Sequence, residues 1–225
     1  MKALIYKELK LAMHPTIYVF IFIFPLMVLI PKYPIAVGFI YVLSCYPILF
    51  LGANKGQQSN DLLFSTLLPV RKKDIVMARI ITIALMQVVF ITVLTWFYPL
   101  RLLMINMVPE LEDVGLTVNG YVSILSFAII GYAIADLIFL PAYYKNGRNI
   151  LLPTLVTIIG FALYIMTVTV AIPYLPVIGE PYKVFLCDSG IWIQFIFLAI
   201  ALLFYFLMHV IVYKVSSKRL EKVDF

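Results

Sequence analysis

The stretch GIWIQFIFLAIALLFYFLMHVIVY, from Gly190 to Tyr213, contains no acidic residue, lysine or arginine. About 20 predominantly apolar residues are enough for a helix to cross the hydrocarbon core of a bilayer, so this stretch predicts a transmembrane helix. A helix satisfies its backbone N–H and C=O groups within its own segment, which a lipid-exposed loop cannot do. The fold of the chain therefore depends on how many such stretches it contains.

Five further apolar blocks precede this one, and each is long enough to span a membrane. The chain is 64% hydrophobic and has a mean hydropathy of +1.06, whereas soluble domains are roughly half apolar. We predict an all-α polytopic membrane protein with six transmembrane helices, which forms a single domain over residues 1–225. The five further blocks are Thr16–Ile30, Pro34–Ala53, Ile75–Tyr98, Tyr121–Leu140 and Ile150–Ile172.

Basic residues are distributed unevenly between the two sides of these predicted spans. Fourteen of the 17 Lys and Arg residues lie near the two termini or in the segments after the second and fourth spans; the others are Lys32, Arg101 and Lys183. Because Lys and Arg are retained in the cytoplasm, we expect both termini to be cytoplasmic. The net charge of +6 reflects this asymmetry, and we expect no nucleic-acid partner.

The first 14 residues, MKALIYKELKLAMH, predict an amphipathic helix on the inner membrane surface. Pro15 would end this helix and let the chain turn into the bilayer. A cleaved signal peptide is the alternative interpretation, but no A-x-A-like cleavage site follows the apolar run. The residues that we assign to the interfacial helix are Lys2, Tyr6, Lys7, Glu8 and Lys10.

The loop over residues 54–79, NKGQQSNDLLFSTLLPVRKKDIVMAR, is the longest polar stretch. Asn60 or Asp61 can cap a short apolar helix that stops at Pro69. An apolar patch ringed by charge is typical of a docking surface, although the same side chains could pack on lipid or on neighbouring spans. The candidate docking residues are Asp61, Leu62, Leu63, Phe64, Ser65, Leu67, Leu68, Pro69, Arg71 and Lys72.

Two segments are expected on the opposite side of the membrane. The first, Pro99–Val108, carries Arg101 among apolar residues, and we expect it to lie along the outer surface. The second, residues 173–189, is rich in Pro and aromatic residues but poor in charge. It could enter the membrane part-way, buried in protein, or rest on the headgroups as an extracellular loop.

Motifs for catalysis, metal binding and nucleotide binding are missing from the sequence. The two histidines, His14 and His209, have no acidic residue nearby, and no hydrolase or metalloprotease motif can be assembled. No G-x-x-x-x-G-K-[ST] sequence occurs either. We therefore expect no catalytic residue, no metal site and no cofactor bound by this chain.

Asp136 is an ionisable residue well inside a predicted span. A carboxyl group in such a place can serve as a proton relay in an ion-coupled transporter. The alternative is structural, because Asp136 lies close enough to the cytoplasmic face to reach interfacial water or to pair with Lys145. Both interpretations are open on the sequence.

The segment LLFSTLLPVRKKDIVMAR resembles a part of small ABC-2 type transporter permeases, in which a Leu- and Ser-rich stretch leads into L-P-V-S-R-K-x-I-V before the third span. Arg71 stands where the family commonly has serine. The six spans, the N-terminal helix and the absence of an ATPase agree with the resemblance. The matching residues are Ser65, Leu67, Leu68, Pro69, Val70, Lys72, Lys73, Asp74, Ile75 and Val76.

The resemblance implies a permease subunit of an ATP-driven ABC exporter in a bacterial plasma membrane. Asp61–Leu68 would be the coupling helix that docks into a separate ABC ATPase subunit, which would bind ATP and Mg. A second permease subunit, the same chain or a sister, would complete the path. The sparse charge in the spans suggests a hydrophobic or amphipathic cargo, and the resemblance implies a membrane-active peptide, such as a toxin or antimicrobial peptide. Permeases of this size resemble the phenol-soluble modulin exporter permeases of staphylococci.

Two other classes of function also have six spans. An ion-coupled secondary transporter would depend on Asp136. The substrate-binding subunit of an energy-coupling-factor uptake system would dock through an Ala-x-x-x-Ala pattern in its first span, and Thr16–Ile30 contains no alanine. Coupling to a separate ATPase is therefore the prediction that we carry forward.

Overall fold

A computed structural model describes residues 2–12, 15–26, 70–107, 121–146, 151–176, 179 and 191–222. Every regular element among these residues is helical, as predicted. The elements are α1 (Lys2–Lys7), the π-helical turn η1 (Glu8–Ala12), α2 (Pro15–Leu26), α5 (Lys72–Met107), α6 (Tyr121–Asn146), α7 (Leu151–Met166), the π-helical turn η5 (Thr167–Ala171), the 3-10 turn η6 (Ile172–Tyr174) and α9 (Ile191–Glu221).

Three of these helices are long and apolar enough to cross a membrane. The stretches are Lys72–Phe97 in α5, Leu125–Lys145 in α6 and Trp192–Glu221 in α9. They correspond to the third, fourth and sixth predicted spans. A shorter apolar helix, α7, lies where the fifth was predicted, and α2 covers part of the first. The second predicted span, over residues 34–53, lies outside the described residues.

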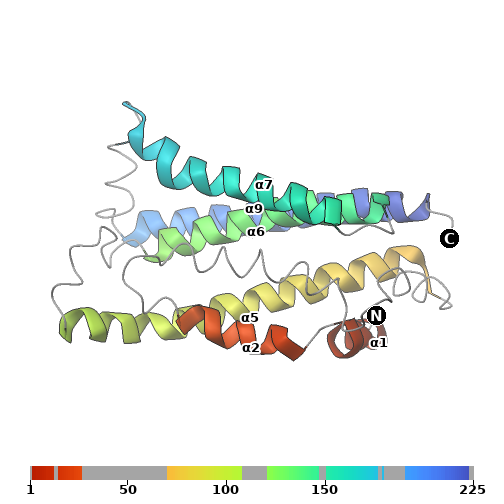
Figure 1. Cartoon of the computed structure of the whole chain (residues 1–225), viewed down its shortest axis with the longest axis horizontal. Helices are drawn as coiled ribbons and strands as arrows, with labels where there is room; N and C mark the ends of the chain where they lie inside the picture. Colours follow the sequence, from red (N-terminus) through yellow and green to blue (C-terminus); the bar gives the residue numbers. More distant parts are fainter. Residues whose placement is uncertain are drawn as a thin grey trace.

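The helices form two layers that meet along α5 (Figure 1). One layer contains α1, α2 and α5, and the other contains α6, α7 and α9. In the second layer α6 packs on both α7 and α9, and it is the most buried of the three candidate spans, whereas α9 is the least buried. Because α5 also packs on α9, it joins the two layers.

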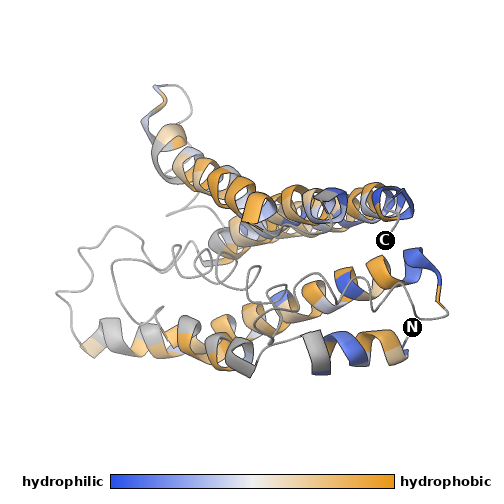
Figure 2. Cartoon of the chain, turned by 45° about the vertical axis from the view of Figure 1, so that its right-hand side comes forward, coloured by the Kyte–Doolittle hydropathy of each residue, from blue (hydrophilic) through white to orange (hydrophobic). Residues whose placement is uncertain are grey.

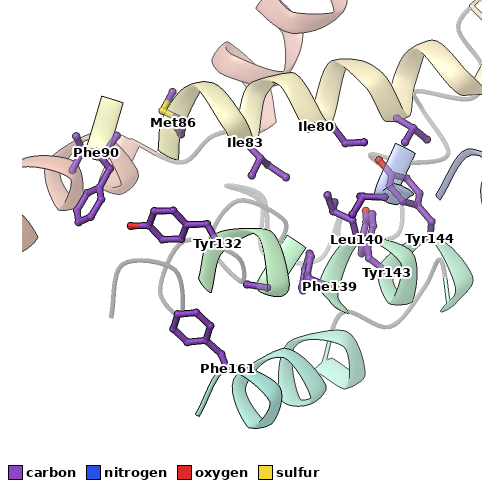
Figure 3. Packing of buried hydrophobic residues seen from close by; sticks show 14 of the residues in the cluster. Ile80, Ile83, Met86, Phe90, Tyr132, Phe139, Leu140, Tyr143, Tyr144 and Phe161 are labelled. Carbon is purple, nitrogen blue, oxygen red and sulfur yellow. The ribbon is translucent and has the colours of Figure 1, made fainter. Parts of the chain in front are cut away.

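The face of α5 that meets the second layer is a stripe of side chains spaced three or four residues apart. Such spacing keeps a stripe on one side of a helix that has 3.6 residues per turn. These side chains pack with aromatic and aliphatic side chains of α6, among them Tyr132, Leu140 and Tyr144 (Figure 3). The apolar members of the stripe are Val76, Ile80, Ile83, Met86, Phe90 and Leu94.

The helix α5 extends further than the predicted third span. The segment from Pro99 to Met107, expected along the outer surface, instead continues α5. A proline inside a helix removes one hydrogen bond, but the Leu, Arg and Met residues that follow are good helix formers. At about 1.5 Å per residue the helix is about 54 Å long, which exceeds the hydrocarbon core of about 30 Å. One end of α5 must therefore project from the membrane.

The two chain termini lie at the same end of the molecule in both views (Figures 1 and 2). Hydrophilic residues gather at this end on α1, α5 and α9 (Figure 2). The start of α5 carries Lys72 and Lys73, and the last turns of α9 carry Lys218 and Arg219. The concentration of basic residues at one end is the pattern by which cytoplasmic boundaries are recognised.

The two tryptophans belong to the opposite end. Trp192 lies in the first turn of α9 and Trp96 in the second half of α5, and each is 79% exposed. From Trp192 to Lys214 the helix α9 rises about 33 Å, close to the thickness of the hydrocarbon core. Tryptophans are enriched at the membrane–water interface, so the spacing between Trp192 and the basic end of α9 matches the thickness of one bilayer.

Candidate functional site

Three buried polar side chains lie on α5, and one of them, Thr82, donates a hydrogen bond within the helix, to the carbonyl oxygen of Ala78. Arg79 and Gln87 are each only 4% exposed; Gln87 contacts the second layer, and Arg79 contacts both the N-terminal segment and α6. A charged or polar group inside a membrane protein is costly unless it finds partners within the protein. Both side chains therefore identify places where α5 makes specific contacts.

Gln87 joins three helices through its side-chain amide. Its Nε2 atom donates to Oδ2 of Asp136 on α6 over 3.1 Å. Its Oε1 atom accepts a hydrogen bond of 2.5 Å from the hydroxyl group of Tyr205 on α9. These two bonds connect the layer of α5 with the layer of α6 and α9.

Asp136 has a second contact, with a histidine of α9. Nε2 of His209 lies 3.1 Å from Oδ2 of Asp136, and the Asp136 side chain is fully buried. The His209 ring also contacts the Tyr205 ring, with 4.1 Å between the centroids. Among the described residues, Oδ1 of Asp136 has no hydrogen-bond partner. The four side chains of Gln87, Asp136, Tyr205 and His209, here called the polar cluster, are thus contiguous.

This cluster corrects two predictions. His209 does have an acidic partner, which the sequence analysis missed because Asp136 lies 73 positions earlier. Asp136 contacts His209 and Gln87 and is fully buried, so it does not reach interfacial water, and Lys145 is exposed. A signal was present, because Asp136 precedes Lys145 and His209 precedes Lys218 by the same nine positions. If α6 and α9 run in the same direction and their basic ends lie at the same level, residues nine positions before those ends lie at the same depth in the membrane.

Arg79 lies two helical turns before Gln87 and pairs with the N-terminal segment. Its Nε and Nη2 atoms are both 2.7 Å from Oε2 of Glu8 in η1. Its Nη1 atom donates a longer bond of 3.4 Å to the hydroxyl group of Tyr143 on α6. The Lys7 ammonium lies 3.7 Å from the other carboxylate oxygen of Glu8. The N-terminal segment, α5 and α6 are therefore tied together at one point.

Glu8, which we assigned to the interfacial helix, is buried in the structure. Its side chain is 6% exposed, and that of Arg79 is 5% exposed. Tyr6 and Lys10 are exposed, and the Lys10 ammonium donates to the Tyr6 hydroxyl over 3.0 Å, while Leu4 is buried. The N-terminal segment is thus amphipathic, with Glu8 turned toward α5 because Arg79 supplies a buried positive charge.

Further contacts join the ends of the helices near the termini. The Lys73 ammonium lies 3.3 Å from Oε1 of Glu221, and both side chains are about half exposed. Nη1 of Arg219 donates to the carbonyl oxygen of Pro141 over 2.6 Å. These contacts tie the end of α9 to the start of α5 and to α6.

Two of the predicted docking residues, Arg71 and Lys72, lie at the start of α5. The helix begins at Lys72, and the backbone N–H of Asp74 donates to the carbonyl oxygen of Arg71 over 2.9 Å. Arg71 is exposed and Lys72 partly so. The other docking residues, over residues 61–69, lie outside the described residues. No group of three or more potential metal ligands occurs among the residues that the structure describes.

Long apolar helices joined by buried polar pairs define a helical membrane protein. A family model described as "ABC-2 family transporter protein" matches residues 3–216. The chain therefore belongs to the ABC-2 transporter family, as its resemblance to ABC-2 permeases implied. No curated protein matches the chain, and no solved structure does.

Proposed function

We propose that this chain is the permease subunit of an ATP-driven ABC exporter in a bacterial plasma membrane, with both termini in the cytoplasm. A separate ATPase subunit would bind ATP and Mg, and a second permease subunit would complete the translocation path. The observation that carries this proposal is the family match over residues 3–216. The gathering of basic residues at the end that holds both termini supports the orientation.

Coupling to the ATPase would use the segment Asp61–Pro69, with Phe64 and its leucine neighbours docked in a cleft of the ATPase. This segment lies immediately before α5 in the sequence. The first two turns of α5 contact Glu8 through Arg79 and Glu221 through Lys73. A displacement of the docked segment would therefore move α5, and with it the N-terminal segment and the end of α9, which contact α5.

The cargo would be a hydrophobic or amphipathic molecule, such as a membrane-active peptide. Among the described residues, α7 and α9 expose large apolar side chains over much of their length, which suits contact with lipid, with a second permease or with such a cargo. The resemblance to phenol-soluble modulin exporters points to the same class of cargo. Representative exposed residues are Leu155, Ile159, Leu163, Ile196, Leu203 and Phe206.

The proposal is tested by purifying the tagged chain from its own membranes and assaying the eluate for ATP hydrolysis. We expect a cassette ATPase to co-purify with the wild-type chain and with the Phe64→Leu control, which keeps an apolar side chain. The ATPase should not co-purify with the Phe64→Asp variant, because a carboxylate in an apolar cleft is not solvated. Recovery of the intact wild-type chain without any ATPase would overturn the proposal.

A second candidate is an ion-coupled transporter, which the buried contact between Asp136 and His209 favours. Proton relays in transporters are built from such intramembrane carboxyl and imidazole groups. This candidate expects Asp136→Asn to abolish transport whether or not an ATPase is present. The proposed exporter instead expects transport to be lost with Phe64→Asp.

A further inference from the structure

We infer that Asp136 and His209 bind one proton between them, and that the polar cluster is a latch that holds α5 against α6 and α9. The inference goes beyond the proposed function and does not depend on it. It rests on which atoms of the cluster can donate and which can only accept.

The tautomer of His209 is fixed by the backbone of its own helix. Its Nδ1 atom lies 2.9 Å from the carbonyl oxygen of Tyr205. A carbonyl oxygen can only accept, so Nδ1 carries a proton. A neutral imidazole has one N–H, and its other nitrogen then presents a lone pair. In the neutral ring, the lone pair of Nε2 would therefore point to Asp136.

That lone pair and a carboxylate oxygen cannot face each other without a proton. Nε2 of His209 lies 3.1 Å from Oδ2 of Asp136, which is an ion-pair distance, although among the described residues the contact does not have the geometry of a hydrogen bond. One proton on the pair removes the repulsion between the two lone pairs, whether it resides on Nε2 as an ion pair or on Oδ2 as a neutral acid. In either form the pair has a net charge of zero, which suits its burial between helices.

Gln87 is oriented so that it can only donate to this pair. Its Oε1 atom is taken by the Tyr205 hydroxyl, which leaves Nε2 for Oδ2 of Asp136. Oδ2 thus receives one donor from α5 and the shared proton on the side of α9. The nearest cation along the buried stripe of α5, Arg79, is already paired with Glu8.

The cluster acts as a latch because its members lie on both layers and because Gln87 and Asp136 are buried. Gln87 comes from the layer of α5, and the other three residues come from α6 and α9. Moving α5 away would leave Asp136 and Tyr205 each short of a partner inside the protein, where an unmade hydrogen bond costs its full desolvation penalty. We therefore expect the bonds of the cluster to form and break together.

The proton site is tested by nitrogen NMR on the full chain. The chain has two histidines, so a His14→Gln background with ¹⁵N-labelled histidine leaves His209 as the single signal. We expect a protonated Nδ1 and an Nε2 resonance that moves on Asp136→Asn. Thr157→Val is the matched control, because this buried hydroxyl donates only within α7, to Pro153 over 2.8 Å. An unprotonated Nδ1, or an Nε2 resonance unchanged by Asp136→Asn, would overturn the assignment.

The latch is tested by a double-mutant cycle on the melting temperature of the full chain in detergent. Asp136→Asn and His209→Gln should each lower it, and the double variant should lower it no more than the larger single change. The changes in melting temperature caused by Asp136→Asn and by Thr157→Val should add in the double variant. If Asp136→Asn does not fold, Gln87→Leu with Tyr205→Phe gives the same cycle on another bond of the cluster. Additive losses within the cluster would overturn the latch, and neither measurement involves an ATPase.

Discussion

Glu8 and Arg79 form a buried ion pair in which one carboxylate oxygen lies 2.7 Å from two guanidinium nitrogens, although 71 positions separate the residues. The pair attaches the N-terminal segment to α5 within two turns of the start of that helix. In a coupled exporter this places the N-terminal segment beside the point where the movement of the ATPase would enter the membrane.

Replacing Arg79 should destabilise the chain severely. Arg79→Ala leaves the Glu8 carboxylate buried without its partner, which typically costs about 3–5 kcal/mol. The measurement is thermal or denaturant unfolding of the purified chain in detergent. The control is Lys73→Ala, since the exposed pair of Lys73 and Glu221 should contribute at most about 1 kcal/mol. Equal losses for the two variants would show that the Glu8–Arg79 pair is not buried as described.

The same pair predicts which double variant recovers stability. Glu8→Leu combined with Arg79→Met replaces both charges by apolar side chains of similar size. Removing a buried pair altogether is often neutral, whereas removing one partner is not. The double variant should therefore be more stable than Arg79→Met alone. A double variant less stable than both single variants would contradict the pairing.

Gln87→Leu should cost about 1–3 kcal/mol of unfolding free energy, because it leaves the Tyr205 hydroxyl and Oδ2 of Asp136 each with one partner fewer. Thr92→Val on the same helix is the control. The Thr92 side chain is exposed and donates to the carbonyl oxygen of Val88 within α5, so its loss should change stability by less than about 0.5 kcal/mol. Comparable effects of the two substitutions would argue against the polar cluster.

The sequence predicted the helical spans better than the contacts between them. Apolar runs such as Gly190–Tyr213 mark spans directly, because lipid leaves the backbone few alternatives. The pairing of Asp136 with His209 depends on which helices are neighbours and in what direction they run, and neither is local information. Glu8 was misjudged for the same reason, because its burial depends on Arg79 in a distant helix. Helix α5 continued through Pro99, where the local rule for proline favoured an end.

The two tryptophans should report the depth of the membrane boundary. Both lie at the end opposite to the basic residues and are exposed, so we expect lipids labelled near the headgroup to quench their fluorescence more than lipids labelled at mid-chain. Trp96→Phe and Trp192→Phe separate the two signals in proteoliposomes. Stronger quenching from mid-chain labels would contradict the assignment of the boundary.

Gly160 allows α7 to approach α6 closely. A Cβ atom at this position would lie 2.6 Å from Cδ1 of Ile138, which is the end of a flexible side chain. Gly160→Ala should thus change stability by no more than about 1 kcal/mol, since alanine favours the helix by about that amount. Gly160→Leu should cost about 1–3 kcal/mol through overpacking. In an Ile138→Val background, which removes Cδ1, Gly160→Ala should become stabilising in a thermal melt.

We propose that ATP hydrolysis by a separate subunit, and not an ion gradient, drives transport by this chain. The most direct measurement is uptake of a fluorescent amphipathic helical peptide by inverted membrane vesicles that contain the chain and its co-purifying ATPase. We predict uptake that requires ATP, persists when a protonophore dissipates the proton gradient, and is lost with Phe64→Asp. Uptake that needs no ATP, stops with the protonophore and disappears with Asp136→Asn would contradict the claim.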